Sequence, residues 1–263
     1  MTPLDRLHAA LGDMGEVAVA VSGGIDSLTL ATAAHRARPG GVTMHHATSP
    51  AVPPEATVRT RALATAEGWP LDVFDAGEFA DPSYRANPVN RCFFCKTSLY
   101  GAVASRTARQ IVSGTNMDDL GEYRPGLEAA RAHGVRHPFV EAGIDKHTVR
   151  ALAAELGLGA LAELPAAPCL SSRIETGIRI EAPVLAMVHE TEKLVGARLS
   201  PRTVRCRVRA NGVVIELDPA ALAAVDAADG LRAEVQQLAD TAGLPAPVRF
   251  AAYRNGSAFL VPA

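Results

Sequence analysis

One hexapeptide near the start of the chain has the residue types that hold a polyphosphate. Ser22-Gly23-Gly24-Ile25-Asp26-Ser27 follows an apolar β-branched segment and enters a segment with helical periodicity. Backbone N–H groups at two glycines and at a helix start form a cradle for an anion, to which serine hydroxyls add hydrogen bonds. Asp26 would repel phosphate and therefore suggests a bridging Mg²⁺. The pattern is neither a Walker A loop nor a Rossmann fingerprint, and it favours an ATP site made by Ser22, Gly23, Gly24, Asp26 and Ser27.

Cysteines form the second chemically informative set, with four in the chain. Cys169 lies in a polar loop beside Arg173, whose charge would favour a nucleophilic thiolate. Cys92 and Cys95 have C-x-x-C spacing just before a predicted helix. That pair fits iron–sulfur ligands, a zinc half-site completed by a histidine, a redox-active pair or reduced thiols. Cys206 alternates with arginines on a predicted strand and is interpreted as a small core residue.

Further polar residues gather where predicted elements end. Gly114 and Thr115 follow a strand and are expected to contact the nucleotide. The acidic side chains after them would hold a metal or orient substrate, or else cap a helix or lie in solvent: Asp118, Asp119 and Glu122. Arg207 and Arg209 share one face of a predicted strand. They would clamp a substrate phosphate, or else form an exposed basic strand face.

The elements that must position these residues alternate between short β-branched strands and Ala-rich helices in the first half. The predicted strands are Val17–Val21, Val42–Ala47, Leu71–Asp75 and Gln110–Ser113. The predicted helices are Ser27–Ala37, Pro54–Glu67 and Lys96–Ala108. This alternation predicts an α/β fold with a doubly wound parallel sheet, whose ligands collect at the carboxyl ends of the strands.

The pattern changes in the second half. Another helix, Asp145–Leu156, precedes a Pro-rich segment, Leu164–Cys169, interpreted as an active-site loop. The elements predicted beyond it are a helix at Pro183–Val195, strands at Val204–Val208 and Gly212–Leu217, helices around Pro219–Ala242 and a strand pair near Val248–Val261. We therefore expect a first domain at 1–175 and a smaller α+β domain at 176–263.

Composition narrows the class of protein. The 263 residues carry 26 Lys+Arg and 28 Asp+Glu, a formal net charge of -2, so we expect no nucleic-acid partner. Asp5, Arg6 and His8 interrupt the N-terminal apolar residues, unlike a secretory signal, and no run is long enough to span a bilayer. We expect a cytoplasmic globular enzyme with reduced thiols.

Two levels of family resemblance follow from these motifs. The hexapeptide resembles the phosphate loop of the PP-loop (ATP pyrophosphatase) family. Three further motifs together resemble the LarE family, namely Asn90-Arg91-Cys92-Phe93-Phe94-Cys95-Lys96, the segment from Gly114 to Gly126, and Cys169-Leu170-Ser171-Ser172-Arg173. The LarE resemblance implies an enzyme that adenylates a carboxylate of a pyridinium-3,5-biscarboxylate mononucleotide and installs sulfur. The product leads to the nickel-pincer nucleotide cofactor of lactate racemase.

The same resemblance implies roles for individual residues. Cys169 matches the family's sulfur-bearing cysteine. Some members of the family have three such cysteines, which this chain matches with Cys92, Cys95 and Cys169. This resemblance implies that the three thiolates would hold a [4Fe-4S] cluster carrying an extra sulfide. Asp26, Arg173 and Glu122 are expected to assist catalysis. Arg207, Arg209 and Glu192 are expected to bind substrate. The resemblance also implies a sulfur donor protein and a homo-oligomer such as a hexamer.

Other functions remain open from the sequence. A related PP-loop sulfurtransferase would act on another small molecule or on tRNA. An NAD-synthetase-like amide ligase would use the same loop but gives no role to Cys92, Cys95 and Cys169. An ATP-regulated iron–sulfur carrier would bind ATP without releasing pyrophosphate. Pyrophosphate release and RNA binding distinguish these possibilities.

Overall fold

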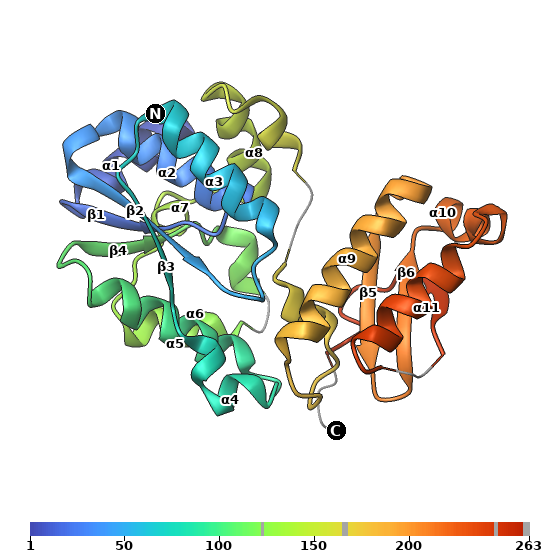
Figure 1. Ribbon diagram of the computed structural model, residues 1–263. Coiled ribbons are helices and arrows are strands. Elements are labelled where there is room, and N and C mark those ends of the chain that lie inside the picture. Colours follow the sequence, from blue (N-terminus) through green and yellow to red (C-terminus); the bar gives the residue numbers. More distant parts are fainter. Residues whose placement is uncertain (122–123, 165–167, 245–246, 260–263) are drawn as a thin grey trace. The chain divides into compact units, whose positions relative to one another are not determined.

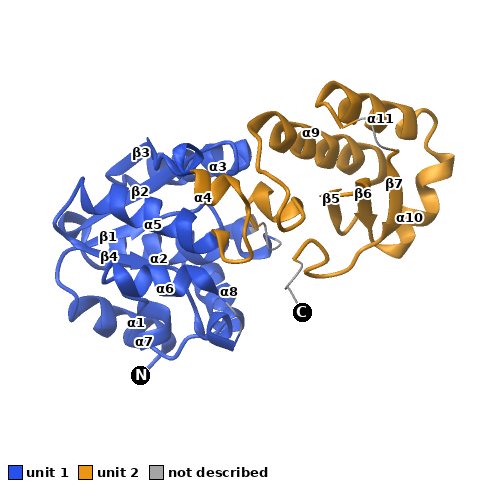
Figure 2. Ribbon diagram, turned by 90° about the horizontal axis from the view of Figure 1, so that it is seen from below, with its two compact units in different colours: residues 1–81, 92–167 blue, residues 82–91, 168–263 orange. Residues whose placement is uncertain are grey.

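The computed structural model describes residues 1–121, 124–164, 168–244 and 247–259 of the chain (Figure 1). It divides into two compact units, shown in different colours in Figure 2. The first contains residues 1–81 and 92–167, and the second contains residues 82–91 and 168–263. The chain therefore enters the second unit briefly at residues 82–91 before it returns to the first.

The first unit is built on a parallel sheet of four strands in the order β3-β2-β1-β4. These strands are β1 (Val17–Ala20), β2 (Val42–Thr48), β3 (Leu71–Asp75) and β4 (Gln110–Ser113). β1 lies between β2 and β4, and all four of its residues are buried. The α/β class with a parallel sheet is confirmed, and each strand lies within one residue of its predicted bounds.

Helices pack on both faces of this sheet. Val17 and Val19 of β1 belong to an apolar cluster with residues of α1 (Pro3–Gly12), α2 (Ile25–Ala37) and α8 (Lys146–Glu155). Ala18 and Ala20 point the other way, into a cluster with residues of α5 (Arg91–Ala104) and α6 (Pro125–Ala132). Because successive side chains of a strand point to opposite faces of the sheet, β1 contributes to an apolar core on each face. The unit also contains α3 (Pro54–Glu67), α7 (Pro138–Glu141), η1 (Pro39–Gly41), η2 (Glu78–Ala80), η3 (Met117–Gly121) and η4 (Gly159–Glu163).

One predicted helix start in this unit is wrong. α5 begins at Arg91, not at Lys96, so Cys92 and Cys95 lie on its first turn and not before it. Their aromatic neighbours, Phe93 and Phe94, are mediocre helix formers, and their propensity gave no helix signal. No described helix in either unit is long and apolar enough to cross a bilayer.

The second unit has a separate sheet of three strands in the order β5-β6-β7. β5 (Val204–Arg209) and β6 (Gly212–Leu217) form an antiparallel hairpin, and β7 (Arg249–Ala252) pairs parallel to β6. Helices α4 (Pro82–Arg85), α9 (Ala182–Leu199), α10 (Pro219–Ala224) and α11 (Leu231–Thr241), with η5 (Leu170–Arg173) and η6 (Val225–Ala227), complete it. The strand pair predicted near Val248–Val261 is wrong in its described part, because β7 pairs with β6 and no second strand follows it up to Phe259.

Asn87 fastens the 82–91 segment inside the second unit. It has a left-handed backbone (φ 53°) and is fully buried. Its Nδ2 donates to the carbonyls of Glu175 (2.9 Å) and Ile178 (3.0 Å), while its Oδ1 accepts from Arg91 Nη1 at 3.0 Å. Two backbone carbonyls and a buried guanidinium find their hydrogen-bond partner in this one amide, so we expect Asn87 to contribute strongly to the free energy of unfolding.

Replacing Asn87 with alanine is expected to lower the free energy of unfolding by about 3 kcal/mol, because it leaves buried polar groups unpaired and places a Cβ without a polar side chain in the left-handed region. Urea unfolding followed by circular dichroism measures the loss. Asn87→Gly is the matched control: it removes the same hydrogen bonds but relieves the backbone, so it should be the less damaging change by about 1 kcal/mol. A loss below about 1 kcal/mol for Asn87→Ala would contradict this role.

Candidate functional site

The phosphate loop connects β1 to α2 in the first unit and is held by its own serines. Ser27 Oγ accepts from the backbone N–H of Ser22 at 3.0 Å and donates to the carbonyl of Gly24 at 3.0 Å. Ser22 Oγ lies 3.1 Å from Ser27 Oγ and accepts from the N–H of Gly24 at 3.3 Å. The two hydroxyls predicted to bind phosphate therefore also fix the loop conformation. Gly24 is the N-cap of α2, so the positive end of that helix faces the loop.

Two glycines permit backbone approaches that no side chain would allow. Gly23 has φ +77°, and a Cβ built on it would lie 2.6 Å from the carbonyl oxygen of Ala56. Gly114, the residue after β4, is as tight, because its Cβ would lie 2.8 Å from the backbone nitrogen of Ser27. β4 is hydrogen-bonded to β1, with Ser113 opposite Ala20. The carboxyl ends of these adjacent strands therefore meet at the loop, as expected for a ligand site in an open parallel sheet.

Asp26 is held by a lysine that the sequence analysis missed. Lys146 Nζ lies 2.6 Å from Asp26 Oδ1 and 2.5 Å from Oδ2, and Asn116 Nδ2 donates to Oδ1 at 3.3 Å. Lys146 is the first residue of α8, and its backbone N–H donates to Asp118 Oδ2 at 2.9 Å. Three segments distant in sequence thus converge on one carboxylate. The only local signal for Lys146 was its place after the helix-capping Asp145.

The two aspartates after β4 accept backbone hydrogen bonds. Asp118 receives the N–H of Lys146, and Asp119 Oδ2 receives the N–H of Asn116 at 3.0 Å. Asp119 Oδ1 also pairs with Arg124 at 3.0 Å. Glu122 lies outside the described residues. The two aspartates therefore shape the loop that presents Asn116 and Lys146 to Asp26.

Thr115 belongs to a short chain of hydroxyls at the end of β4. Its Oγ1 lies 3.1 Å from Ser113 Oγ, which in turn lies 2.9 Å from Nδ1 of His137. Burial lowers the pKa of His137, which favours the neutral imidazole. A neutral, hydrogen-bonded patch therefore borders the cluster of charged groups at Asp26.

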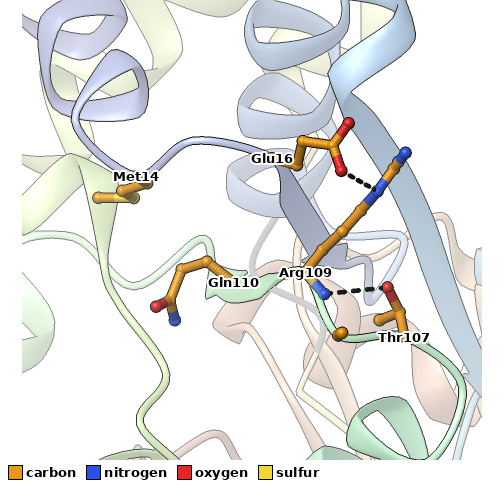
Figure 3. Close-up of a pocket in the computed structure, with 6 residues that line it drawn as sticks. Met14, Glu16, Thr107, Arg109 and Gln110 are labelled. Carbon is orange, nitrogen blue, oxygen red and sulfur yellow. Dashed lines mark hydrogen bonds and ion pairs between the residues drawn. The ribbon is translucent and has the colours of Figure 1, made fainter.

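A cavity of about 500 Å³ lies elsewhere in the first unit (Figure 3). Its lining comes from the amino ends of β1 and β4: Met14, Glu16, Thr107, Ala108, Arg109 and Gln110. Glu16 and Arg109 form a salt bridge of 3.4 Å across it. This is the end of the sheet opposite the phosphate loop, where open parallel sheets do not bind ligands, so we assign it no function.

Cys169 lies in the second unit and is exposed. It is the N-cap of η5, at whose other end Arg173 is buried. Arg173 forms a two-pronged salt bridge with Glu192, with both N···O distances 3.0 Å, and donates to the carbonyl of Pro168 at 2.6 Å. Its charge is thus balanced by Glu192, and its N–H groups hold the backbone beside Cys169. Arg173 shapes the cysteine loop.

Arg207 and Arg209, predicted as a phosphate clamp, share one carboxylate. Arg207 Nε lies 3.0 Å from Glu216 Oε2 and Arg209 Nη2 lies 2.9 Å from Oε1. Arg207 is buried and also donates to the carbonyl of Ser172 at 3.0 Å, so it is not part of an exposed strand face. Burial would raise the pKa of Glu216, but hydrogen bonds from Ser257 and Arg207 and the charges of the two arginines hold it below its usual value. Glu216 was missed, although it is the one acid in an apolar strand.

The remaining cysteines differ in their surroundings. Cys92 and Cys95 are half-buried and three residues apart on α5, hence on one face of that helix. Cys206 is fully buried and burial raises the pKa of its thiol, which agrees with a core role. All four cysteines are described, and none is in a disulfide. Among the described residues, no three His, Cys, Asp or Glu side chains gather as a metal site.

Comparison with known proteins gives the family. No protein-family model matches the chain. An uncharacterized protein of Synechocystis is 36% identical over 220 residues, which cover 82% of this chain and 81% of that protein. An uncharacterized protein of Methanocaldococcus jannaschii is 29% identical over 136 residues, which cover 50% of this chain and 52% of that protein.

A third relative has a named activity. The pyridinium-3,5-bisthiocarboxylic acid mononucleotide synthase of Lactiplantibacillus plantarum is 32% identical over 219 residues. The match covers 81% of this chain and 79% of the synthase, so it includes residues of both units. The chain belongs to the family of this synthase, the LarE family.

Proposed function

We propose that this protein is an ATP-dependent sulfur transferase of the PP-loop class with a doubly wound first domain. In this proposal it adenylates a carboxylate of a pyridinium-3,5-biscarboxylate mononucleotide and converts it to a thiocarboxylate. The observation that carries the proposal is the phosphate loop, where Gly23 and Gly114 leave no room for a side chain beside backbone N–H groups at the start of α2. The named relative supports the choice of substrate.

ATP binding would use the charged groups already gathered at Asp26. The loop N–H groups and the start of α2 would receive the phosphates, and Mg²⁺ would neutralise part of their charge while held by Asp26. Lys146 engages both oxygens of Asp26. A cation that binds Asp26 must displace Lys146, which frees the ammonium group to pair with phosphate oxygens. Gly114, Thr115 and Asn116 would border the nucleotide from β4.

The adenylation step needs no acid or base from the protein. A substrate carboxylate oxygen attacks the α-phosphorus of ATP, the bond to the bridging oxygen breaks, and pyrophosphate leaves. The protein contributes position and charge stabilisation, which is how phosphate-transfer sites generally act. The resulting acyl-adenylate is an activated electrophile, and only a nearby sulfur nucleophile is then required.

Cys169 is the proposed sulfur nucleophile. Its exposure permits access to an acyl group, and Arg173 and Glu192 keep its loop in shape. The thiolate attacks the acyl carbon and AMP leaves, giving a thioester. Loss of the Cys169 α-proton to a base, with cleavage of the Cβ–S bond, leaves the sulfur on the product as a thiocarboxylate and dehydroalanine in the protein. By this route each chain would act once.

A recyclable variant of the reaction would need an iron–sulfur cluster. We propose that Cys92 and Cys95, with Cys169, hold a [4Fe-4S] cluster, which would supply an extra sulfide to the acyl-adenylate in place of the Cys169 sulfur. The support is the C-x-x-C spacing on one face of α5. Three thiolates leave one iron without a protein ligand, as such sulfide chemistry requires.

Substrate recognition is proposed for the second unit. Arg207, Arg209 and Glu192 remain our candidates for the mononucleotide, with Glu216 as the carboxylate that orients both arginines. Arg209 Nη1 also lies 3.8 Å from Glu175, so a phosphate group would replace this longer ion pair. We further propose a cytoplasmic homo-oligomer that a sulfur donor protein reloads.

The decisive experiment measures pyrophosphate. Purified protein with Mg-ATP should release pyrophosphate only when the pyridinium biscarboxylate mononucleotide is added, and mass spectrometry should show a thiocarboxylate product. Asp26→Asn should reduce the release by about 100-fold or more, because it removes the proposed Mg²⁺ ligand. The matched control is Asp13→Asn, at the exposed C-cap of α1, which should leave it unchanged. No substrate-dependent pyrophosphate from the wild type would refute the function.

A further inference from the structure

Helix α3 lies directly against the phosphate loop. The carbonyl oxygen of Ala56 and its Cβ lie 2.6 and 2.9 Å from where a Cβ on Gly23 would be. One turn further along, Arg59 Nε donates to the carbonyl of Gly23 at 2.8 Å. The guanidinium group of Arg59 therefore lies at the loop itself. This hydrogen bond fixes α3 to the carbonyl side of the loop.

A buried histidine fixes α3 to the end of β1. His46 of β2 is fully buried, its Nδ1 lies 2.8 Å from the carbonyl of Val21, and its Nε2 lies 2.9 Å from Thr57 Oγ1. A carbonyl only accepts, so Nδ1 carries the proton, and in the neutral ring Nε2 accepts from the Thr57 hydroxyl. This link holds the first turn of α3 beside Val21, the residue that precedes Ser22. The position of Arg59 is thus set by two independent contacts.

Arg59 forms no salt bridge among the described residues, although the charge of Glu55, one turn earlier on α3, acts on it. Arg36, by contrast, pairs with Glu67, and Arg109 pairs with Glu16. It is half-buried, and burial lowers the pKa of its guanidinium, although an arginine keeps its charge in proteins. A partly desolvated cation normally has an anion beside it. At this place in the fold, the phosphates of a ligand in the loop would supply such an anion.

We propose that Arg59 is a polyphosphate-binding residue, so that α3 contributes a cation to the ATP site. The inference rests on the proposed function and adds a residue that the loop motif does not contain. With Nε on Gly23, the guanidinium still has four N–H donors at its two terminal nitrogens, which suit a two-pronged bond to phosphate. Arg59 would therefore recognise the β- and γ-phosphates and not the nucleoside.

The test compares ligands with and without a polyphosphate. Dissociation constants for Mg-ATP, pyrophosphate and AMP are measured by calorimetry on the full chain, for the wild type, Arg59→Met and Arg59→Lys. Arg61→Met is the matched control, because it removes the same charge from an exposed position on the same helix. Thermal unfolding without ligand shows whether each variant is folded, and Arg59→Lys provides a second, charge-conserving variant.

We expect Arg59→Met to weaken Mg-ATP and pyrophosphate by roughly tenfold to a hundredfold, the cost of losing a charged hydrogen bond. AMP binding should change less than about twofold, Arg59→Lys should fall between, and Arg61→Met should match the wild type. Equal affinity of Arg59→Met and wild type for Mg-ATP would overturn the role of Arg59 alone. Equal loss for AMP and ATP would also overturn it, since that points to a general distortion. Failure of the wild type to bind ATP would instead refute the proposed function.

Discussion

Replacing Cys169 with alanine is expected to reduce thiocarboxylate formation by roughly a thousandfold or more, the usual scale for losing a nucleophile. Substrate-dependent pyrophosphate release should continue for a first turnover, because the ATP groups at Asp26 and Lys146 are separate from the cysteine loop in sequence and bonding. The measurement pairs a pyrophosphate assay with mass spectrometry of both the nucleotide product and the protein.

The other cysteines provide the controls for Cys169. Cys206→Ala alters a buried core residue and should leave product formation intact in protein that remains folded. Cys92→Ala and Cys95→Ala distinguish the two proposed sources of sulfur, the Cys169 side chain and a cluster-bound sulfide. The cluster would be supported if anaerobic reconstitution gives the wild type roughly four irons per chain, and if these variants lose both the iron and repeated turnover. Dehydroalanine at position 169 after a single turnover would support the sacrificial route. Unchanged product from Cys169→Ala would contradict both.

Replacing Gly114 with alanine is expected to weaken Mg-ATP binding by about 100-fold or more. The new methyl group would lie 2.8 Å from the nitrogen of Ser27 and 2.9 Å from the carbonyl carbon of Asp26, and neither backbone atom can move alone. The end of β4 and the first turn of α2 must therefore move apart, which disrupts the backbone geometry that would bind phosphate. Calorimetry with Mg-ATP measures the effect.

A second glycine variant controls for the mutation type. Gly12, the last residue of α1, has no atom within 4 Å of an added Cβ. Gly12→Ala should therefore bind ATP normally and unfold at the same temperature or slightly higher. If Gly114→Ala also bound ATP within twofold of the wild type, the close approach of β4 to the loop would have no part in nucleotide binding.

Local signals explain what the sequence predicted well. The strands β1 and β4 are short, mostly buried apolar runs, and burial on both faces makes such runs easy to recognise. The phosphate loop was recognised for a similar reason, since its serines, glycines and aspartate are contiguous. The α1 helix was missed although Thr2 and Asp5 form a capping box around Pro3, a local signal that was present.

Pairings across long sequence distances explain most of what was missed. Lys146 and Asp26 are 120 residues apart, and no pattern near either one specifies the other. The two-residue alternation correctly placed Arg207 and Arg209 on one face of a strand. Their shared partner, Glu216, depends on the register of the β5–β6 hairpin, which periodicity does not give.

The excursion of residues 82–91 into the second unit affects how the protein is made. On a ribosome this segment emerges long before its partners, since the Tyr84 hydroxyl bonds to a serine hydroxyl 87 residues later in the chain. Domains usually fold as units during synthesis, but here the early segment must wait, with a buried tyrosine and asparagine exposed, until the C-terminal part arrives. Synthesis of the partners from Ser171 to Ile180, not N-terminal folding, would therefore set when the segment can fold. A chain truncated after residue 167 would leave the segment without these partners.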